Sequence, residues 1–417
     1  MRWRDPTAPA TTAGHETTTR HVGALYPLLH AVGHGVPGVV IGTDLLGGLF
    51  TYDPFSLYAA GALTNPNAIV FGQIGRGKSS LVKTYVLRQL AFGRRAFVLD
   101  PKGEYGGLAE AVGATTLAIE PGGHLRLNPL DLAEGVGTDG RSRRLHLLEA
   151  LLTSSLGRPL SPRERAALEM ALDAAGPSPT IPAVAAGLLS PDPAAASMLQ
   201  TTLAELAEDG RDVGLELRRL VAGDLAGMFD GPTTEGLALD GSLVVLDLSA
   251  LYGSPALGLV MVCATAWLQS VVASSAASGR QVLLVVDEAW AILRDVSVAR
   301  WLQASWKLSR AWGVANMAVL HRVSDLAAVG AEGSEQRQLA AGLLLDSETR
   351  IVYAQPPGEL AAAAELLDLT PIETEVVGRL GRGVALWKVG SHASLVRHQL
   401  GALEWELIDT DRAMGRR

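Results

Sequence analysis

A glycine-rich loop between an apolar run and a helical run is the feature that most constrains the fold. The apolar segment 67 to 71 is followed by GQIGRGKSS at 72 to 80, and apolar residues then recur at helical spacing to residue 90. The loop matches GxxxxGK[ST] directly after a predicted strand and at the start of a predicted helix, which is the context that this motif requires. The sequence therefore predicts a binding site for a nucleoside triphosphate.

The residue types in this loop suit phosphate binding. Glycines allow backbone N–H groups to wrap around phosphates, and the N-terminus of a helix adds partial positive charge. We expect Lys78 to reach the β and γ phosphates of ATP and Ser79 to bind Mg²⁺. The predicted ATP-binding residues are Gly72, Gln73, Ile74, Gly75, Arg76, Gly77, Lys78, Ser79 and Ser80. The alternative is a glycine-rich turn ahead of an ordinary helix.

A second acidic position follows another apolar run. Asp287 comes directly after VLLVV, where an aspartate holds magnesium through water in nucleotide hydrolases of this kind. Glu288 comes next, and a carboxylate there can polarise the attacking water, so it is the candidate general base. The alternative for both residues is a polar strand end and a helix N-cap.

Other candidate residues have simpler explanations beside the functional ones. His321 ends the apolar run VANMAVL and is a candidate sensor of the γ phosphate, or else an ordinary histidine at a strand end. Arg310 lies one predicted helix earlier, where it is either an arginine finger for a neighbouring subunit or a solvated helix charge. In DPKGEY, Asp100, Lys102 and Glu104 either lie near the phosphates or Asp100 caps the following helix.

Strands alternate with helices along most of the chain, which predicts an α/β fold with a mostly parallel central sheet. Ligand sites in such sheets lie at the carboxyl ends of the strands. Two alternating runs near the end predict an antiparallel hairpin on the sheet edge. The expected domains are a flexible lead-in (1–35), a β-hairpin extension (36–60), the first part of the ATPase core (61–130), an all-helical insertion (131–235) and the second part of the core (236–417).

Composition narrows the function classes. The formal net charge of −8 over 417 residues argues against a surface that is basic throughout, as in a passive nucleic-acid coat. The single cysteine, Cys263, excludes an intramolecular disulfide and favours a reducing compartment, so we expect a cytoplasmic protein. The apolar stretch from Ala256 to Ala273 contains Thr265 and Gln269 and predicts a buried helix rather than a membrane span. The acidic run 404 to 411 predicts a solvated edge strand and tail.

Five segments occur in an order that resembles a known family. They are GQIGRGKSS, DPKGEY, LNPLD, VVDEAW and HRVSDL, and the resemblance extends from about residue 36 to the end. The chain resembles the conjugation and type IV secretion ATPases of the TraG/FtsK/HerA superfamily, particularly the VirB-class assembly ATPase of actinobacteria.

The resemblance implies a RecA-like domain with a helical insertion, hexamers with ATP and Mg²⁺ at subunit interfaces, and hydrolysis that drives secretion. By position, Lys78 and Ser79 become Walker A, Asp287 and Glu288 become Walker B, and Arg310 becomes the finger that acts on the next subunit. Many members carry glutamine where this chain has His321. Larger members also have an N-terminal domain that binds membrane components, whereas about sixty residues precede the core here.

Three functions follow as hypotheses. The first is an ATP-hydrolysing motor of a conjugative or type IV secretion apparatus, a homo-oligomeric ring at the cytoplasmic membrane face with channel components, and DNA or a DNA–relaxase complex, as partners. The second is a DNA pump of the FtsK, HerA or coupling-protein type. The third is a nucleotide-gated scaffold with little turnover, against which the intact Glu288 weighs.

Overall fold

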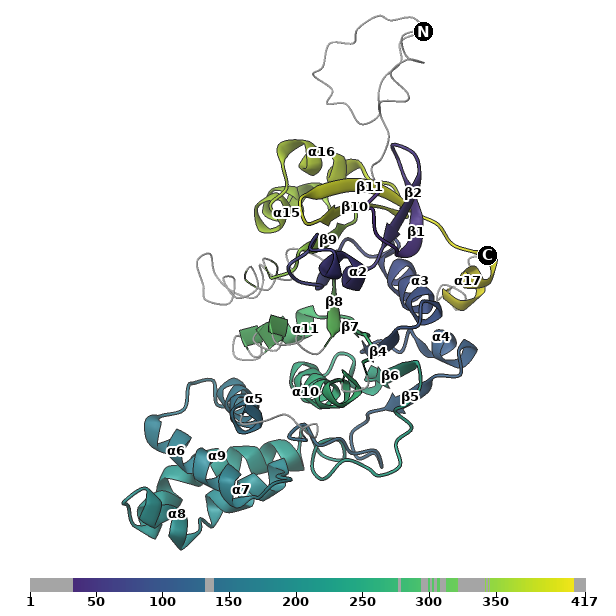
Figure 1. Cartoon of the computed structure of the whole chain (residues 1–417). Helices are drawn as coiled ribbons and strands as arrows, with labels where there is room; N and C mark the ends of the chain where they lie inside the picture. The colour runs from purple at the N-terminus through teal and green to yellow at the C-terminus, as the bar shows by residue number, and fades with distance from the viewer. Residues whose placement is uncertain are drawn as a thin grey trace, which may run out of the picture. The chain divides into compact units, whose positions relative to one another are not determined.

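The computed structural model describes residues 33–131, 139–276, 279–293, 299–300, 302–303, 306–307, 313–321, 342, 344 and 346–408. The chain divides into two compact units. Figure 1 labels the helices and strands of the chain. The first unit comprises residues 1–94, 315–328 and 341–417, and the second comprises 95–314 and 329–340.

The first unit is built on mixed strands. Their order is β2 (Leu49–Tyr52), β1 (Val39–Asp44), β11 (His392–His398), β10 (Val384–Val389), β9 (Thr349–Val352), β3 (Ala68–Phe71) and β8 (Val314–Leu320). The pairs of β3 with β9 and with β8 are parallel, and all the other pairs of this unit are antiparallel. The two hairpins β1–β2 and β10–β11 thus extend a parallel core from the outer side of β9.

Helices of the first unit begin where the sequence supplies caps. Asp53 accepts the Ser56 N–H at the start of α2 (Pro54–Ala59), and Thr370 with Glu373 forms a capping box at α16 (Pro371–Arg379). The remaining helices are α3 (Lys78–Ala91), α15 (Leu360–Leu367) and α17 (Ala402–Ile408), with a short 3₁₀ turn η4 (Pro357–Glu359).

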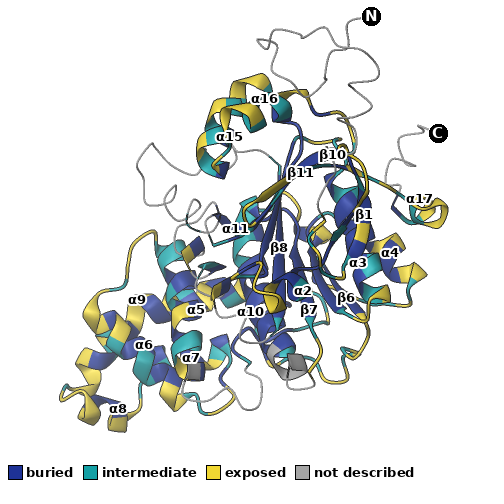
Figure 2. Ribbon diagram, turned by 45° about the horizontal axis from the view of Figure 1, so that its top comes forward, coloured by how far each residue is buried: buried dark blue, intermediate teal, exposed yellow. Residues whose placement is uncertain are grey.

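The second unit contains four parallel strands in the order β7 (Val282–Val286), β4 (Arg95–Asp100), β6 (Leu243–Asp247) and β5 (Thr115–Ala118). Every residue of β4 and of β7 is buried (Figure 2). Continuous apolar strands are typical of a parallel sheet that is covered on both faces. The connecting elements are α4 (Gly106–Ala111), η2 (Ser249–Leu251), α10 (Leu257–Ala276) and α11 (Trp290–Leu293).

The described residues between β5 and β6 contain five helices. They are α5 (Asp139–Leu156), α6 (Pro162–Ala174), α7 (Ile181–Leu189), α8 (Pro193–Met198) and α9 (Leu203–Ala222). Capping boxes start α6 at Ser161 and α9 at Thr202. At Gly210 and Gly214 of α9 an added Cβ would come within about 3 Å of Leu188 atoms, so the small residues allow α7 and α9 to pack closely.

The expected fold class is confirmed: an α/β fold with parallel core strands, antiparallel hairpins and a helical insert. Among the described residues, no helix combines the length and the hydropathy needed to cross a bilayer. The strand predicted within 404–411 was wrong, because residues 402–408 form helix α17. The domain boundaries drawn from the sequence stay predictions.

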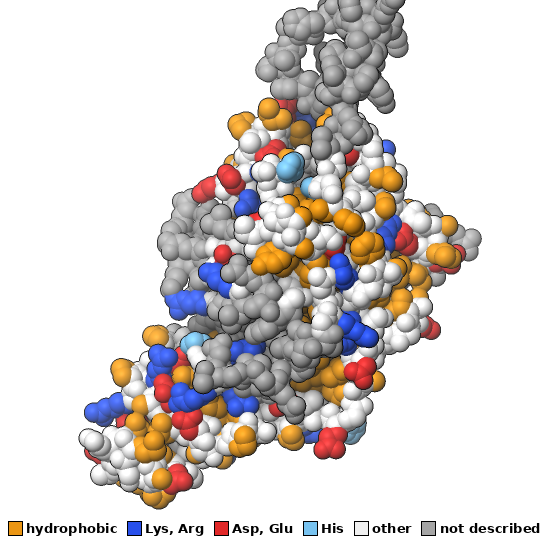
Figure 3. Space-filling view, in the orientation of Figure 1, with side chains coloured by type: hydrophobic (Ala, Val, Ile, Leu, Met, Phe, Trp, Pro, Cys, Tyr) orange, Lys and Arg blue, Asp and Glu red, His pale blue; other side chains and the backbone are white. Residues whose placement is uncertain are grey.

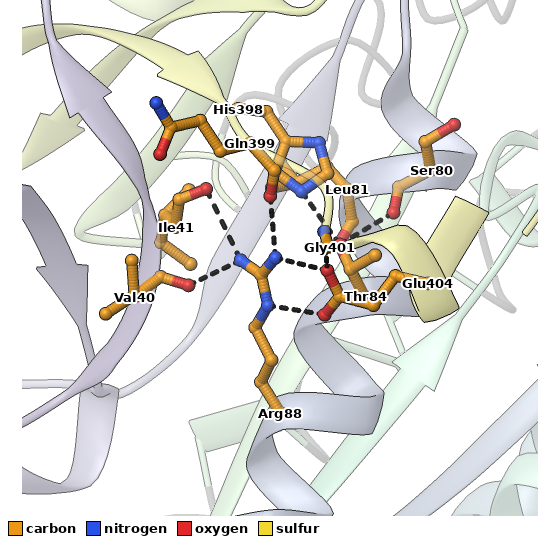
Figure 4. Close-up of polar contacts among 10 residues, drawn as sticks. All are labelled: Val40, Ile41, Ser80, Leu81, Thr84, Arg88, His398, Gln399, Gly401 and Glu404. Atoms are coloured by element: carbon orange, nitrogen blue, oxygen red, sulfur yellow. Dashed lines mark hydrogen bonds and ion pairs between the residues drawn. The ribbon is translucent and has the colours of Figure 1, made fainter.

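Arg88 connects α17 with α3 (Figure 4). Its guanidinium donates to both carboxylate oxygens of Glu404 at 2.7 and 2.6 Å. The same group donates to the carbonyl of Val40 in β1 at 2.5 Å and to that of Gln399 after β11 at 2.6 Å. One side chain of α3 therefore ties together β1, the end of β11 and α17.

A histidine lies beside this contact. Nε2 of His398 is 2.8 Å from the hydroxyl of Thr84 on α3. Burial, together with the charge of Arg88, lowers the pKa of His398 to about 4, so the imidazole is neutral at pH 7. The neutral ring adds a hydrogen bond without adding a second cation beside the guanidinium.

We expect Arg88→Met to lower the free energy of unfolding by about 1–3 kcal/mol, because it removes a cation that bonds both oxygens of the partly buried Glu404 carboxylate and the carbonyl groups of Val40 and Gln399. Denaturant titration would measure the loss. Arg219→Met is the matched control, since Arg219 is 54% exposed in its ion pairs and its loss should cost about 0.5 kcal/mol or less. Equal stability losses in the two variants would contradict the prediction.

Candidate functional site

The glycine loop (residues 72–80) follows β3 and leads into α3, as the sequence predicted. Gly72, Gly75 and Gly77 have φ values of +154°, +79° and +107°, which side-chain-bearing residues rarely adopt. A Cβ at Gly72 would lie 2.4 Å from Cβ of Tyr353, whereas a Cβ at Gly75 would meet nothing within 4 Å. Glycine is thus required at Gly72 for close packing and at Gly75 for backbone conformation alone.

Lys78 turns back into the loop. Its ammonium donates to the carbonyl of Gly72 and, at 3.2 Å, to that of Gln73, and the residue is buried. Within the part of the chain that the structure describes, no side chain caps the N-terminus of α3, whose N-cap residue is Gly77. Helix-start N–H groups without a side-chain cap fit an anionic ligand, so the loop is suited to phosphate.

Two residues that were not predicted from the sequence form hydrogen bonds with backbone carbonyl groups of the glycine loop. The buried Tyr353, just after β9, donates its O–H to the carbonyl of Gly77 at 3.4 Å. Gly383 donates its N–H to the carbonyl of Arg76 at 2.9 Å, and its Cα would be 3.5 Å from a Cβ at Gly77. Both residues lie in or beside strand-like runs of the sequence, and no motif marks them.

His321 lies at the same edge of the first unit as the glycine loop. Phe71 of β3 is paired in parallel with Leu320 of β8, so the next residues, Gly72 and His321, leave the strands side by side. This is where a group that senses the γ phosphate would be needed, but the sensing role stays a prediction. Arg310 lies outside the described residues.

In the second unit, three aspartates lie at the carboxyl ends of neighbouring parallel strands. Asp100 of β4 is paired with Asp247 of β6, while Asp287 directly follows β7 and donates its N–H to the Leu99 carbonyl. Asp100 accepts three backbone N–H groups of the DPKGEY segment at 2.8 to 3.3 Å. Asp100 therefore closes the turn before α4, but α4 has Tyr105 as its N-cap and no side-chain cap hydrogen bond, so the structure does not support a capping role for Asp100; the position of this segment near the phosphates stays a prediction.

Asp287 has an unusual protonation equilibrium. It is 5% exposed. Burial, together with the charge of Glu288, raises its pKa to about 7. Tyr105 is buried beside it, and burial with the charges of Asp287 and Asp100 raises the pKa of that phenol well above its usual range. An excess of buried negative charge is the setting in which a divalent cation is favoured.

The fit to magnesium is partial, as expected for Mg²⁺ shared with a nucleotide. The described residues contain no group of three or more His, Cys, Asp or Glu side chains placed to hold a metal ion. Magnesium at nucleotide sites usually keeps several waters and takes one or two protein ligands plus phosphate oxygens. Ser79 and Asp287 as protein ligands of Mg²⁺ stay predictions.

Glu288 is held in a strained and enclosed position. Its φ of +51° is left-handed, which is uncommon for a residue other than glycine. Its side chain is 1% exposed and forms an ion pair with Lys102, while the indole N–H of Trp290 donates to the other carboxylate oxygen. The sequence predicted Glu288 as a base but did not connect it with Lys102.

The structure thus groups the predicted residues by unit. Lys78, Ser79 and His321 belong to the first unit, and Asp287 and Glu288 belong to the second. Within the glycine loop, Arg76 donates to the side-chain oxygen of Gln73, and Ile74 is 68% exposed.

Comparison with known proteins gives fold relatives only. No protein-family model matches the chain, and no curated protein matches its sequence. The structure is similar to that of VirB4 of Thermoanaerobacter pseudethanolicus, with a TM-score of 0.71 and 21% identity over 88% of this chain and 98% of that one.

The fold is also similar to that of a plasmid coupling protein. TrwB, solved as an unbound bacterial conjugative coupling protein, matches with a TM-score of 0.55 and 14% identity, covering 91% of both chains. TrwB in complex with ADP and Mg²⁺ matches with a TM-score of 0.56 over 91% of this chain and 92% of that one. The chain therefore has the fold of VirB4 and of the TrwB coupling protein.

Proposed function

We propose that the protein is an ATP hydrolase that drives a conjugative or type IV secretion apparatus. The observation that carries the proposal is the glycine loop, whose positive-φ glycines and inward-turned Lys78 suit phosphate binding at the start of α3. The similarity in fold to VirB4 and TrwB supports the choice of process.

In this proposal each group has one task. Backbone N–H groups of the glycine loop and the ammonium of Lys78 hold the β and γ phosphates. Ser79 and Asp287 hold Mg²⁺, which neutralises charge on the phosphate oxygens when it is bound. Glu288 accepts the proton of the attacking water, and His321 contacts the γ phosphate from the end of β8.

The finer parts of the proposal rest on the family resemblance. The first is a homo-oligomeric ring of six subunits, in which Arg310 acts on the ATP of the next subunit. The second is association with channel components at the cytoplasmic face of the membrane. The actinobacterial type and DNA or a DNA–relaxase complex as a partner are proposed on the same ground.

A DNA-translocating pump is the second candidate, because TrwB is described as a coupling protein. On the face drawn in Figure 3, basic side chains of the α5–α9 helices lie among acidic ones. Ion pairs such as Arg141 with Asp173 and Arg165 with Glu149 account for this mixture. Strong, salt-dependent stimulation of ATP hydrolysis by DNA would favour the pump.

A nucleotide-gated scaffold is the remaining candidate. Absence of ATP turnover at high protein concentration would favour it.

We expect Lys78→Ala to abolish ATP binding and turnover, and Glu288→Gln to bind ATP normally but to lose turnover by about 100-fold or more. Nucleotide titration and a phosphate-release assay would separate the two effects. Glu406→Gln, an exposed change on α17, is the control that should keep full activity. Unchanged turnover in Glu288→Gln would refute the assignment of the base.

We expect Asp287→Asn to stabilise the protein at pH 8 without Mg²⁺ while abolishing turnover. The carboxyl has an ordinary pKa of 3.8 when unfolded and about 7 when folded, so stability falls as pH rises between these values. The stability difference between variant and wild type should grow over that window to about 2–4 kcal/mol. Thermal unfolding from pH 4 to 8 would measure it.

The exposed Asp212→Asn on α9 is the control for this series and should follow the wild-type pH dependence. If Asp287→Asn were equally or less stable than the wild type at pH 8, Asp287 would not be held as a strained, buried charge.

We expect mixtures of Lys78→Ala and Arg310→Ala to recover part of the activity that each variant lacks alone. In a ring, a subunit with an intact glycine loop would face a neighbour with an intact arginine. Mixing Lys78→Ala with Glu288→Gln is the control, because both residues are proposed to serve the same subunit's ATP. No recovery in the first mixture would count against Arg310 as a finger.

A further inference from the structure

The DPKGEY segment supplies a cation directly to the carboxylate proposed as the base. Nζ of Lys102 forms an ion pair with Oε1 of Glu288, and the Trp290 indole N–H donates to Oε2. The two oxygens of one carboxylate are therefore contacted from two different segments, the turn after β4 and the start of α11. The side chain of Glu288 is 1% exposed, and that of Lys102 is 24% exposed.

The backbone that carries Lys102 is itself fixed. Asp100 accepts the N–H of Lys102 at 3.3 Å and the N–H of Tyr105 at 2.8 Å, so the turn is closed on both sides of the lysine. Gly103 has a φ of +68°, and a Cβ there would lie 3.2 Å from Cβ of Ser249. The ammonium also lies 5.7 Å from the ring centroid of Tyr252. Lys102 thus reaches Glu288 from a turn with little freedom to move.

We propose that Lys102, together with Trp290, forms a clamp that sets the direction of the Glu288 carboxylate, so that Lys102 is a positioning residue for ATP hydrolysis. The inference rests on the proposed function, because it concerns the same base. Lys102 contacts Glu288 and is assigned no contact with the nucleotide.

Charge explains why the clamp needs a cation. Glu288 follows Asp287 in sequence, and the charges of Asp100 and Glu104 also act on Asp287, so three buried carboxylates and the half-buried Glu104 lie near one another. Burial opposes the charge of Lys102, but the hydrogen bond and the charge of Glu288 outweigh it and raise the pKa of this lysine. Removing one member of a buried ion pair leaves the other charge uncompensated, which favours a different side-chain direction.

Geometry explains why direction matters for the rate. A base acts only when its oxygen lies within hydrogen-bond reach of the proton that it accepts, and a misplacement of about 1 Å can cost on the order of 100-fold in rate. The left-handed backbone of Glu288 sets the direction in which its side chain leaves the main chain, and the clamp sets the position of its carboxylate. A merely structural ion pair would affect stability without a selective effect on kcat.

The decisive variant is Lys102→Met, which keeps the length of the side chain and removes its charge. We expect kcat for ATP hydrolysis to fall by about 10- to 100-fold, with KM and the affinity for a non-hydrolysable ATP analogue within about twofold of wild type. Lys102→Arg should recover most of the loss. Trp290→Phe removes the other donor and should lower kcat several-fold with the same unchanged affinity.

Lys388→Met is the matched control. Lys388 is another partly buried lysine, 17% exposed, in a 3.0 Å ion pair with Glu373 that links β10 and α16 in the first unit. Its removal should leave kcat within about twofold of wild type. A kcat of Lys102→Met within twofold of wild type, a higher kcat, or an equal loss in Lys102→Arg would overturn the inference.

A thermal unfolding cycle guards against misfolding of the single variant. Wild type, Lys102→Met, Glu288→Gln and the double variant are compared, and the double variant should be more stable than Lys102→Met because the uncompensated charge is gone. If the stability losses of the two single variants simply added in the double variant, the proposed clamp would be wrong. Absent turnover in the wild-type protein would overturn the proposed function as well, whereas normal wild-type turnover with an unaffected Lys102→Met would overturn only this inference.

Discussion

Parallel pairing is the constraint on which the candidate site depends. In each unit it brings the carboxyl ends of neighbouring strands to one edge, so residues far apart in sequence leave the strands together. In the first unit this brings the glycine loop beside His321, and in the second it gathers Asp100, Asp247 and Asp287. The grouping of the residues that we propose for catalysis therefore follows from the direction of the strands, independently of the contacts between side chains.

The charged groups at the strand ends differ in sign between the two units. The first unit offers backbone N–H groups and Lys78, which suit an anion, whereas the second unit buries carboxyls so deeply that the pKa of Asp287 rises to about 7. A magnesium nucleotide carries both kinds of charge, phosphate and cation. The charge offered at the strand ends therefore differs between the two units.

Local patterns in the sequence were sufficient for the elements and for the main motif. The run before Gly72 and the helical spacing after Ser79 predicted β3 and α3 closely, because each signal lies within one short segment. Side-chain contacts across the fold had no such signal. Arg88 and Glu404 are 316 residues apart, so their ion pair has no local signal, and the acidic run around Glu404 was taken for a strand although it lies in helix α17. The link from Lys102 to Glu288 was missed for the same reason.

Glycine serves two unrelated purposes in this chain of 46 glycines. Gly75 bears a backbone conformation that a ligand loop needs, whereas Gly210 and Gly214 leave room for Leu188 in a neighbouring helix. Substitution by alanine would therefore fail at these positions for different reasons, one conformational and the other steric. When sequences related to this one are compared, an invariant glycine in α9 would record the spacing of two helices and should not be counted as evidence for a binding site.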